Sequence, residues 1–221
     1  MKTYSTQNIR NVVLLGSTKA GKTTLSEAML YEGKVIDRRG TVEGKNTVSD
    51  NAEIEQINQR SVYATPLYAE FMDTKFNIID TPGADDFVGG AVSAFKVCDL
   101  GVLVVNAQQG VEVGTQIYAR YAKNYHIPLV VAVNQLDGEK ASWETTLESM
   151  KETFGGKPVV VQYPVTVGPE FDGFIDVLKM KYYRFEGDTG KRQDLEIPAD
   201  KMDEAEELRN ALIERAAEYD D

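Results

Sequence analysis

The stretch that decides the fold of this chain is Gly16-Ser17-Thr18-Lys19-Ala20-Gly21-Lys22-Thr23. It fits the pattern G-x-x-x-x-G-K-[ST], in which glycines let successive main-chain N–H groups curl around phosphate oxygens. An apolar run at residues 12–15 precedes the stretch and predicts a buried strand, and residues 24–30 predict the start of a helix. In this context the stretch predicts a loop that binds the phosphates of a nucleoside triphosphate.

Three side chains in and beside this loop have distinct predicted roles. Lys22 would reach the β- and γ-phosphates, and the hydroxyl of Thr23 would bind a Mg²⁺ ion. Thr24 opens the predicted helix, whose positive N-terminal end adds to the phosphate site. The alternative is a glycine-rich turn with a solvated lysine, which the flanking strand and helix disfavour.

Strand-like and helical segments alternate along most of the chain. The predicted strands are residues 12–16, 61–71, 75–80, 101–107 and 129–133, and the predicted helices end near 32 or span 86–97, 115–125 and 142–154. Residues 33–59 form a long polar loop, which is usually a sign of function or disorder. Short apolar strands separated by helices predict an α/β, three-layer P-loop NTPase fold, with helices on both faces of a mostly parallel sheet.

The pattern of alternating apolar strands and helices ends after residue 157. A strand begins at residues 159–161, short strands and turns fill 165–185, and Pro198 opens an amphipathic helix. One apolar stripe of this helix predicts a packing surface: Met202, Ala205, Leu208, Leu212, Ala216 and Tyr219. We therefore expect a nucleotide-binding domain at 1–157, without its last strand and base-binding loop, and a partial α+β subdomain at 158–221.

Composition excludes several classes of protein. The net charge of −11 over 221 residues argues against non-specific nucleic-acid binding, which needs clustered Lys and Arg. Cys98 is the only cysteine, so an internal disulfide is impossible and a reducing cytoplasm is expected. No apolar run approaches the roughly 18 residues of a membrane span, and residues 1–10 are too polar for a secretory signal.

Two further motifs follow predicted strands. In Asp80-Thr81-Pro82-Gly83, the aspartate can hold Mg²⁺ through water and the glycine N–H can reach the γ-phosphate. In Asn134-Gln135-Leu136-Asp137, the final carboxylate can accept from the ring N–H and the exocyclic amine of guanine. Alone, these motifs are common turns; in series with the phosphate loop they predict a guanine nucleotide. Adenine lacks both donors, so an ATPase or kinase is the less favoured alternative.

The three motifs, in this order, resemble those of translational GTPases. Other stretches are similar to elongation factor G in particular, namely residues 77–83 with Asp86-Phe87, 104–112 and 171–181. The similarity runs from about residue 10 to 219. It implies GTP or GDP and Mg²⁺ as ligands, a cytoplasmic location, and the ribosome, including its stalk protein, as partner, with no membrane and no sequence-specific nucleic acid. It also implies that residues 171–181 begin a subdomain that the family inserts into its GTP-binding domain.

Two departures from the family pattern concern hydrolysis. Ala84 stands where a histidine positions the attacking water, and Tyr63 stands where a loop threonine closes on Mg²⁺. A methyl group cannot orient water, and such positioned groups contribute about 10² to 10⁴ in rate. Asp85 could substitute, although its charge near the γ-phosphate is unfavourable, and Thr65 would face the same side of a strand as Tyr63. No catalytic residue is assigned, and hydrolysis is expected to be weak or absent.

Two other departures concern nucleotide affinity. Lys19 stands where the family has aspartate, and its ammonium group either replaces a monovalent cation near the β–γ bridge or is simply solvated. Gln135 replaces the lysine of N-K-x-D, so guanine affinity drops while Asp137 keeps the selectivity.

The resemblance leaves alternatives open. The chain is expected to be the GTP-binding domain of an elongation factor G-like protein with weak or absent hydrolysis. The alternatives are a fully active ribosome-stimulated GTPase, a ribosomal protection protein, or a non-catalytic ribosome-binding module. The family's last guanine-binding loop has no counterpart here, so an amino-terminal fragment of a longer protein is expected.

Overall fold

The computed structural model describes residues 3–154, 158–187 and 190–218. The chain forms two compact units, Met1–Asn134 and Gln135–Asp221. The boundary between the units, after Asn134, lies before the boundary at residue 157 that the sequence pattern predicts. Each unit is described by itself.

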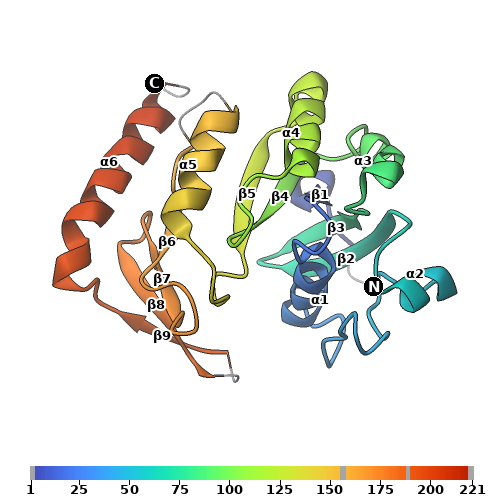
Figure 1. Cartoon of the computed structure of the whole chain (residues 1–221), viewed down its shortest axis with the longest axis horizontal. Helices are drawn as coiled ribbons and strands as arrows, with labels where there is room; N and C mark the ends of the chain where they lie inside the picture. The colour runs from blue at the N-terminus through green and yellow to red at the C-terminus, as the bar shows by residue number, and fades with distance from the viewer. Residues whose placement is uncertain (1–2, 155–157, 188–189, 219–221) are drawn as a thin grey trace. The chain divides into compact units, whose positions relative to one another are not determined.

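The first unit is built on a five-stranded sheet with the order β2-β3-β1-β4-β5 (Figure 1). Its strands are β1 (Ile9–Leu15), β2 (Thr65–Phe71), β3 (Thr74–Asp80), β4 (Leu100–Asn106) and β5 (Leu129–Asn134). β1 pairs in parallel with β3 and β4, β4 pairs in parallel with β5, and only the edge strand β2 is antiparallel. The carboxyl ends of β1, β3, β4 and β5 therefore meet at one edge, where α/β proteins bind their ligands.

Helices cover both faces of this sheet, because its central strands are apolar on both sides. The helices of the unit are α1 (Lys22–Glu32), α2 (Glu53–Asn58), α3 (Val88–Ala94) and α4 (Val113–Tyr125), with 3-10 turns at Thr6–Asn8 and Asp85–Phe87. Leu25 and Met29 of α1 pack beside Val12 and Ile78. The alternate residue Val13 faces the other way and is equally buried. The expected α/β fold with a mostly parallel sheet is confirmed.

The second unit combines an antiparallel sheet with two helices. Its elements are α5 (Trp143–Phe154), β6 (Gln162–Pro164), β7 (Gly173–Asp176), β8 (Lys181–Glu186), β9 (Lys191–Leu195), a 3-10 turn at Ala199–Lys201 and α6 (Met202–Ala217). The strand order is β6-β7-β8-β9. Its core gathers Tyr163, Ile175 and Ala205, with Trp143 of α5 and Leu208 of α6 packed against them.

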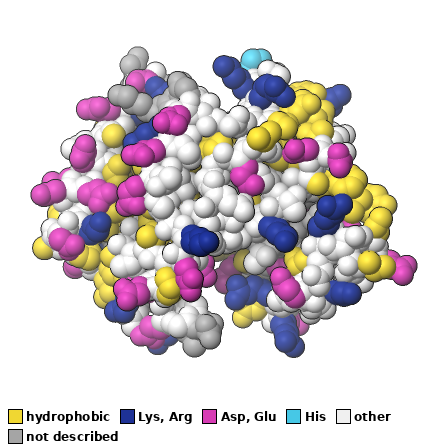
Figure 2. All heavy atoms as spheres, viewed as in Figure 1, with side chains coloured by type: hydrophobic (Ala, Val, Ile, Leu, Met, Phe, Trp, Pro, Cys, Tyr) yellow, Lys and Arg dark blue, Asp and Glu magenta, His cyan; other side chains and the backbone are white. Residues whose placement is uncertain are grey.

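The apolar stripe predicted for α6 does pack on this core over most of its length. Ala205 is fully buried, and Met202, Leu208 and Leu212 lie against the cluster. Ala216 is exposed, and Tyr219 lies outside the described residues. Figure 2 shows Asp and Glu side chains gathered over α6, as expected for a solvated acidic face.

Several boundaries differ from those expected. The polar segment 33–59 contains the short helix α2, and the strand expected from residue 61 begins only at Thr65. Both differences have one cause, since the Glu55 carboxylate accepts the N–H groups of Ala52, Val62 and Tyr63. The strand expected from residue 159 begins at Gln162, and β9 lacks the apolar alternation that would have predicted it.

No helix in the described part of the chain has the length and apolar character that a membrane span requires.

Candidate functional site

The glycine-rich loop joins the end of β1 to the start of α1. Gly16 has φ +139° and Gly21 has φ +100°, values that residues with a side chain rarely adopt. A Cβ at Gly16 would stand 2.3 Å from the carbonyl oxygen of Val104, and one at Gly21 would stand 2.2 Å from Nδ2 of Asn134. The backbone therefore needs glycine at both positions to pass between β4 and the end of β5.

Lys22 turns back into this loop and is buried. Its Nζ donates to the carbonyl oxygens of Gly16 (2.9 Å) and Ser17 (3.0 Å). Burial lowers the pKa of Lys22 to about 8, and the negative charges of Asp80, Asp50 and Glu112 oppose the shift. An ammonium group held this way supplies a positive charge with donors inside the loop, as phosphate binding requires.

Gly83 brings the loop after β3 against this lysine. A Cβ there would stand 2.4 Å from Nζ of Lys22 and 2.7 Å from the carbonyl oxygen of Ser17. The phosphate loop and the segment after Asp80 therefore approach each other closely at Gly83, as their predicted common role requires.

Asp80 ends β3 with a carboxylate that is 0% exposed. Its Oδ2 accepts from Oγ1 of Thr23 (2.8 Å), whereas its Oδ1 has no hydrogen-bond partner among the described residues. Burial raises the pKa of Asp80 to about 6, and the nearby hydroxyl groups of Ser49 and Thr23 and the charge of Lys22 oppose that shift. A buried, unsatisfied carboxylate oxygen beside a threonine hydroxyl fits a hard cation such as Mg²⁺.

This position offers a metal few protein carboxylates. Within the described residues, no group of three or more Asp, Glu, His and Cys side chains is arranged to hold a metal ion. A cation here would depend on hydroxyl oxygens and on the phosphates of a bound nucleotide, which is the usual way that proteins hold Mg²⁺.

Asn134 links the third predicted motif to the phosphate loop. Its Nδ2 donates to the carbonyl oxygen of Ala20 (2.9 Å), so the amide positions the loop from the end of β5. Gln135 (φ +59°) and the exposed Asp137 follow in the second unit, where the N–H of Gly138 closes a turn on the carbonyl of Gln135 (3.2 Å). The guanine-binding roles of these side chains stay predictions.

Ala84 occupies the position of the expected histidine, and Asp85 begins the 3-10 turn that follows it. Ala84 has ordinary extended backbone angles (φ −83°, ψ 139°) and presents only a methyl group. Asp85 lies next to the first turn of α4, because a Cβ at Gly114 would stand 3.2 Å from its Oδ1. A carboxylate beside a helix N-terminus is electrostatically favourable, which gives Asp85 a structural role there.

The side chain that meets Thr23 from the polar loop is Ser61, which the sequence analysis missed. The hydroxyl oxygens of these two residues are 3.2 Å apart. Tyr63, which aligns with the expected threonine, is 58% exposed, and the Thr65 hydroxyl donates to the carbonyl of Ser49 (3.3 Å). A serine two residues before the aligned position was the available signal.

Two buried glutamates order the polar loop, and neither was singled out from the sequence. Glu27 of α1 is 1% exposed and accepts the N–H groups of Gly40 (2.8 Å) and Val48 (2.6 Å). Glu55 holds residues 52 and 62–63 in the same way. Such carboxylate–amide bonds are about twice as strong as neutral ones, so they fix the loop against α1.

Replacing Glu27 with glutamine should loosen this loop. The amide group keeps one acceptor and turns a donor toward a main-chain N–H, so the free energy of unfolding should fall by about 1–3 kcal/mol. Thermal unfolding and the rate of tryptic cleavage after Lys45 would measure the effect. Glu43→Gln, on an exposed glutamate of the same loop, is the matched control. Equal cleavage rates for both variants would show that Glu27 does not hold the loop.

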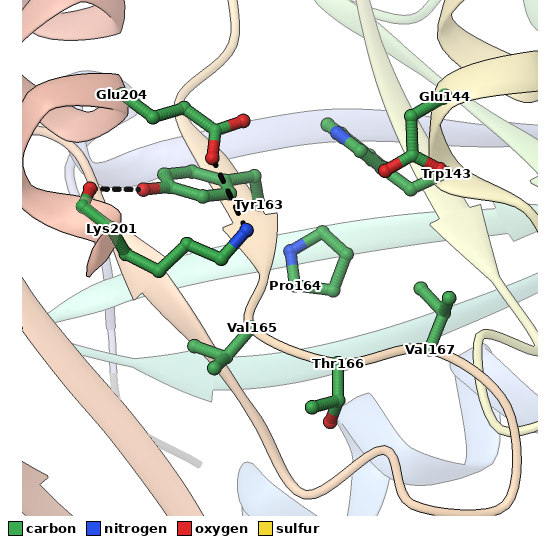
Figure 3. Close-up of a pocket in the computed structure, with 9 residues that line it drawn as sticks. All are labelled: Trp143, Glu144, Tyr163, Pro164, Val165, Thr166, Val167, Lys201 and Glu204. Carbon is green, nitrogen blue, oxygen red and sulfur yellow. Dashed lines mark hydrogen bonds and ion pairs between the residues drawn. The ribbon is translucent and has the colours of Figure 1, made fainter. Parts of the chain in front are cut away.

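A small hollow in the second unit carries no comparable chemistry (Figure 3). Trp143, Tyr163, Thr166, Lys201 and Glu204 are among the residues that line it. The Tyr163 hydroxyl donates to the carbonyl oxygen of Lys201 (3.1 Å), and Lys201 Nζ pairs with Glu204 (3.4 Å). Tyr163, Lys201 and Glu204 thus pair with one another, and Thr166 donates to the carbonyl oxygen of Glu170 (2.8 Å).

The glycine loop between a central parallel strand and a helix, with its buried lysine and the adjacent Thr23–Asp80 pair, defines a P-loop nucleotide-binding domain. The family described as elongation factor Tu GTP binding domain matches residues 7–217, and the chain belongs to this family. The predicted relationship to elongation factor G-like translational GTPases is confirmed.

Two similar proteins give the relationship its detail. An elongation factor G from Mycoplasma genitalium is 32% identical over all 221 residues, which correspond to 32% of that relative. A crystal structure of a protein from Thermus thermophilus superposes with a TM-score of 0.89 at 31% identity, covering 96% of this chain and 32% of that one. The chain thus spans about a third of the length of each.

Proposed function

We propose that this chain is the GTP-binding domain of an elongation factor G-like protein that acts on the ribosome in the cytoplasm, with weak or absent GTP hydrolysis. The observation that carries this proposal is the juxtaposition of a complete phosphate loop with a methyl group at Ala84. The loop and Lys22 can bind a triphosphate, whereas the methyl group of Ala84 cannot orient water at the position of the family's histidine.

Different residues would bind the phosphates and the metal ion of the nucleotide. The phosphate-binding residues are Gly16, Ser17, Thr18, Lys19, Ala20, Gly21, Lys22, Thr23, Thr24 and Gly83. The metal-binding residues are Thr23 and Asp80. Main-chain N–H groups of the loop and the start of α1 face the phosphates, and Lys22 adds charge. When bound, Mg²⁺ would neutralise phosphate charge; Thr23 and Asp80 would hold it directly or through water.

The guanine base would be recognised by Asn134, Gln135 and Asp137. Replacing Asp137 with asparagine should lower GTP affinity by about 10²-fold, because two charge-assisted hydrogen bonds are lost at about 1.5 kcal/mol each. Weak ATP binding should not change. Titration with fluorescent GDP and competition with GTP and ATP would measure both, with the exposed Glu139→Gln as control. A variant with unchanged GTP preference would contradict the assignment.

Phosphate release by the full-length protein, with and without ribosomes, tests the proposed function. We expect GDP and GTP binding, association with ribosomes through contacts that include the stalk protein, and slow turnover in both conditions. Strong ribosome-stimulated turnover would identify an active GTPase and overturn the claim of weak hydrolysis. Ribosome binding without any nucleotide binding would identify a non-catalytic module.

A further inference from the structure

We propose that Tyr118 of α4 is a positioning residue for the γ-phosphate, because its hydroxyl group fixes the orientation of the peptide unit between Pro82 and Gly83. The N–H of this peptide unit belongs to Gly83, the predicted γ-phosphate ligand. The inference deepens the proposed function and rests on it, since it concerns how the same site distinguishes GTP from GDP.

Tyr118 is buried against the loop that follows β3. The residue is 1% exposed, and its hydroxyl group donates to the carbonyl oxygen of Pro82 (2.9 Å), which is itself a buried residue. Burial raises the pKa of Tyr118 to about 12, and the charge of Asp85 adds to the increase, so the hydroxyl group keeps its proton at neutral pH. Buried carbonyl oxygens are almost always hydrogen-bonded, so this contact holds Pro82 in place.

The same contact determines where the N–H of Gly83 points. The carbonyl oxygen of Pro82 and the N–H of Gly83 lie in one planar trans peptide unit, in which they point in opposite directions. Because the carbonyl group points at α4, the N–H points away from α4. A peptide unit rotated by half a turn would present the carbonyl oxygen instead, which is an acceptor and cannot bind phosphate oxygens.

The loop around this peptide unit is held from two other directions. At its start, Oγ1 of Thr81 donates to the carbonyl oxygen of Leu14 in β1 (2.6 Å). At its end, a Cβ on Gly83 would stand 2.4 Å from Nζ of Lys22. The peptide unit therefore touches α4 at its carbonyl oxygen and the buried ammonium group of the phosphate loop at Gly83.

α4 also contacts the phosphate loop, which fixes the position of Tyr118 relative to that loop. Oγ of Ser17 and Oγ1 of Thr115 are 3.3 Å apart in a buried contact. A Cβ on Gly114 would stand 3.0 Å from Oγ of Ser17, so the first turn of the helix approaches the loop closely. Thr115 and Tyr118 are three positions apart and share one face of α4. This face therefore holds both loops that would surround the γ-phosphate.

Loss of the hydroxyl group should affect GTP and GDP differently. Without it the peptide unit could rotate, and GTP would bind only those molecules in which the N–H of Gly83 points correctly. The apparent affinity falls in proportion to that fraction. GDP has no γ-phosphate, so its affinity should not depend on this N–H. Tyr118 therefore acts on the ratio of the two affinities, whereas a purely structural residue would change both alike.

Equilibrium binding of GDP and of a non-hydrolysable GTP analogue to the 221-residue chain tests the inference. Tyr118→Phe removes only the hydroxyl group, and its ring fills the same space, so the variant is expected to fold. It should bind the GTP analogue about tenfold more weakly, as for a correct orientation populated one-tenth of the time, and GDP as tightly as before. Tyr125→Phe, at the more exposed end of the same helix, is the matched control and should change neither affinity.

The peptide unit can also be observed directly by NMR. Pro82 is the only one of the seven prolines that a glycine follows, so ¹³C-labelled proline carbonyls and ¹⁵N-labelled glycines give one correlated amide resonance. We expect this resonance to shift or broaden in Tyr118→Phe, because Pro82 loses its donor, and to stay unchanged in Tyr125→Phe. Thermal unfolding would establish that each variant is folded.

The outcomes separate this inference from the proposed function. In folded Tyr118→Phe, an unchanged resonance or an unchanged ratio of GTP-analogue to GDP affinity would overturn the role of Tyr118, as would tighter binding of the analogue. Failure of the unmodified chain to bind GDP would instead overturn the proposed function. The NMR comparison needs no nucleotide, so it would still test Tyr118 in that case.

Discussion

Replacing Ala84 with histidine is expected to raise the rate of GTP hydrolysis by about 10²- to 10⁴-fold, the range that a positioned acid–base group contributes. The imidazole would restore a group that can hold the attacking water at the place where the family carries one. The extended backbone angles at Ala84 suit any residue, so histidine imposes no main-chain strain at this position. Single-turnover phosphate release, with and without ribosomes, would measure the change.

Ala84→Phe is the matched control for this gain of activity, because it adds a ring of similar size without nitrogen. It should leave the rate at the level of the original chain. A rapid unmodified protein, with little gain from histidine, would mean that another group orients the water and that Ala84 does not limit hydrolysis.

Replacing Lys22 with alanine is expected to lower the affinity for GTP and GDP by about 10²-fold or more. Its ammonium group is the buried cation of the loop, and one charge-assisted hydrogen bond alone contributes up to about 3 kcal/mol. Burial disfavours the charge of Lys22 and lowers its pKa to about 8, so replacement by alanine also removes this desolvation cost and the variant is expected to fold. Equilibrium titration with fluorescent GDP would measure the loss.

Lys96→Ala is the control for general charge effects, since Lys96 is exposed and lies away from the glycine loop in the sequence. Its nucleotide affinity should equal that of the unmodified chain. If Lys22→Ala were folded and still bound GDP normally, the glycine loop would not be a phosphate site.

Local pattern was sufficient to predict most of the sheet of the first unit. The apolar runs that became β1, β4 and β5 are short and continuous, as strands buried on both faces must be. The conformation of the polar segment 33–64 could not be predicted, because Glu27 and Glu55 hold it by accepting hydrogen bonds from main-chain N–H groups. Every residue except proline has a main-chain N–H, so the sequence does not show which of these groups the two carboxylates bind.

By itself, the sequence determined the phosphate loop, because Gly16 and Gly21 leave no room for a Cβ and the lysine and threonine occupy fixed places on the first turn of a helix. It also determined the family, through the order of three such local motifs. Only the tertiary structure decided that Ser61, rather than Tyr63 or Thr65, meets Thr23, and that the Thr23 hydroxyl donates directly to Asp80. These contacts join residues about 30 or more positions apart, so the path of the intervening loop controls them and no local pattern encodes them.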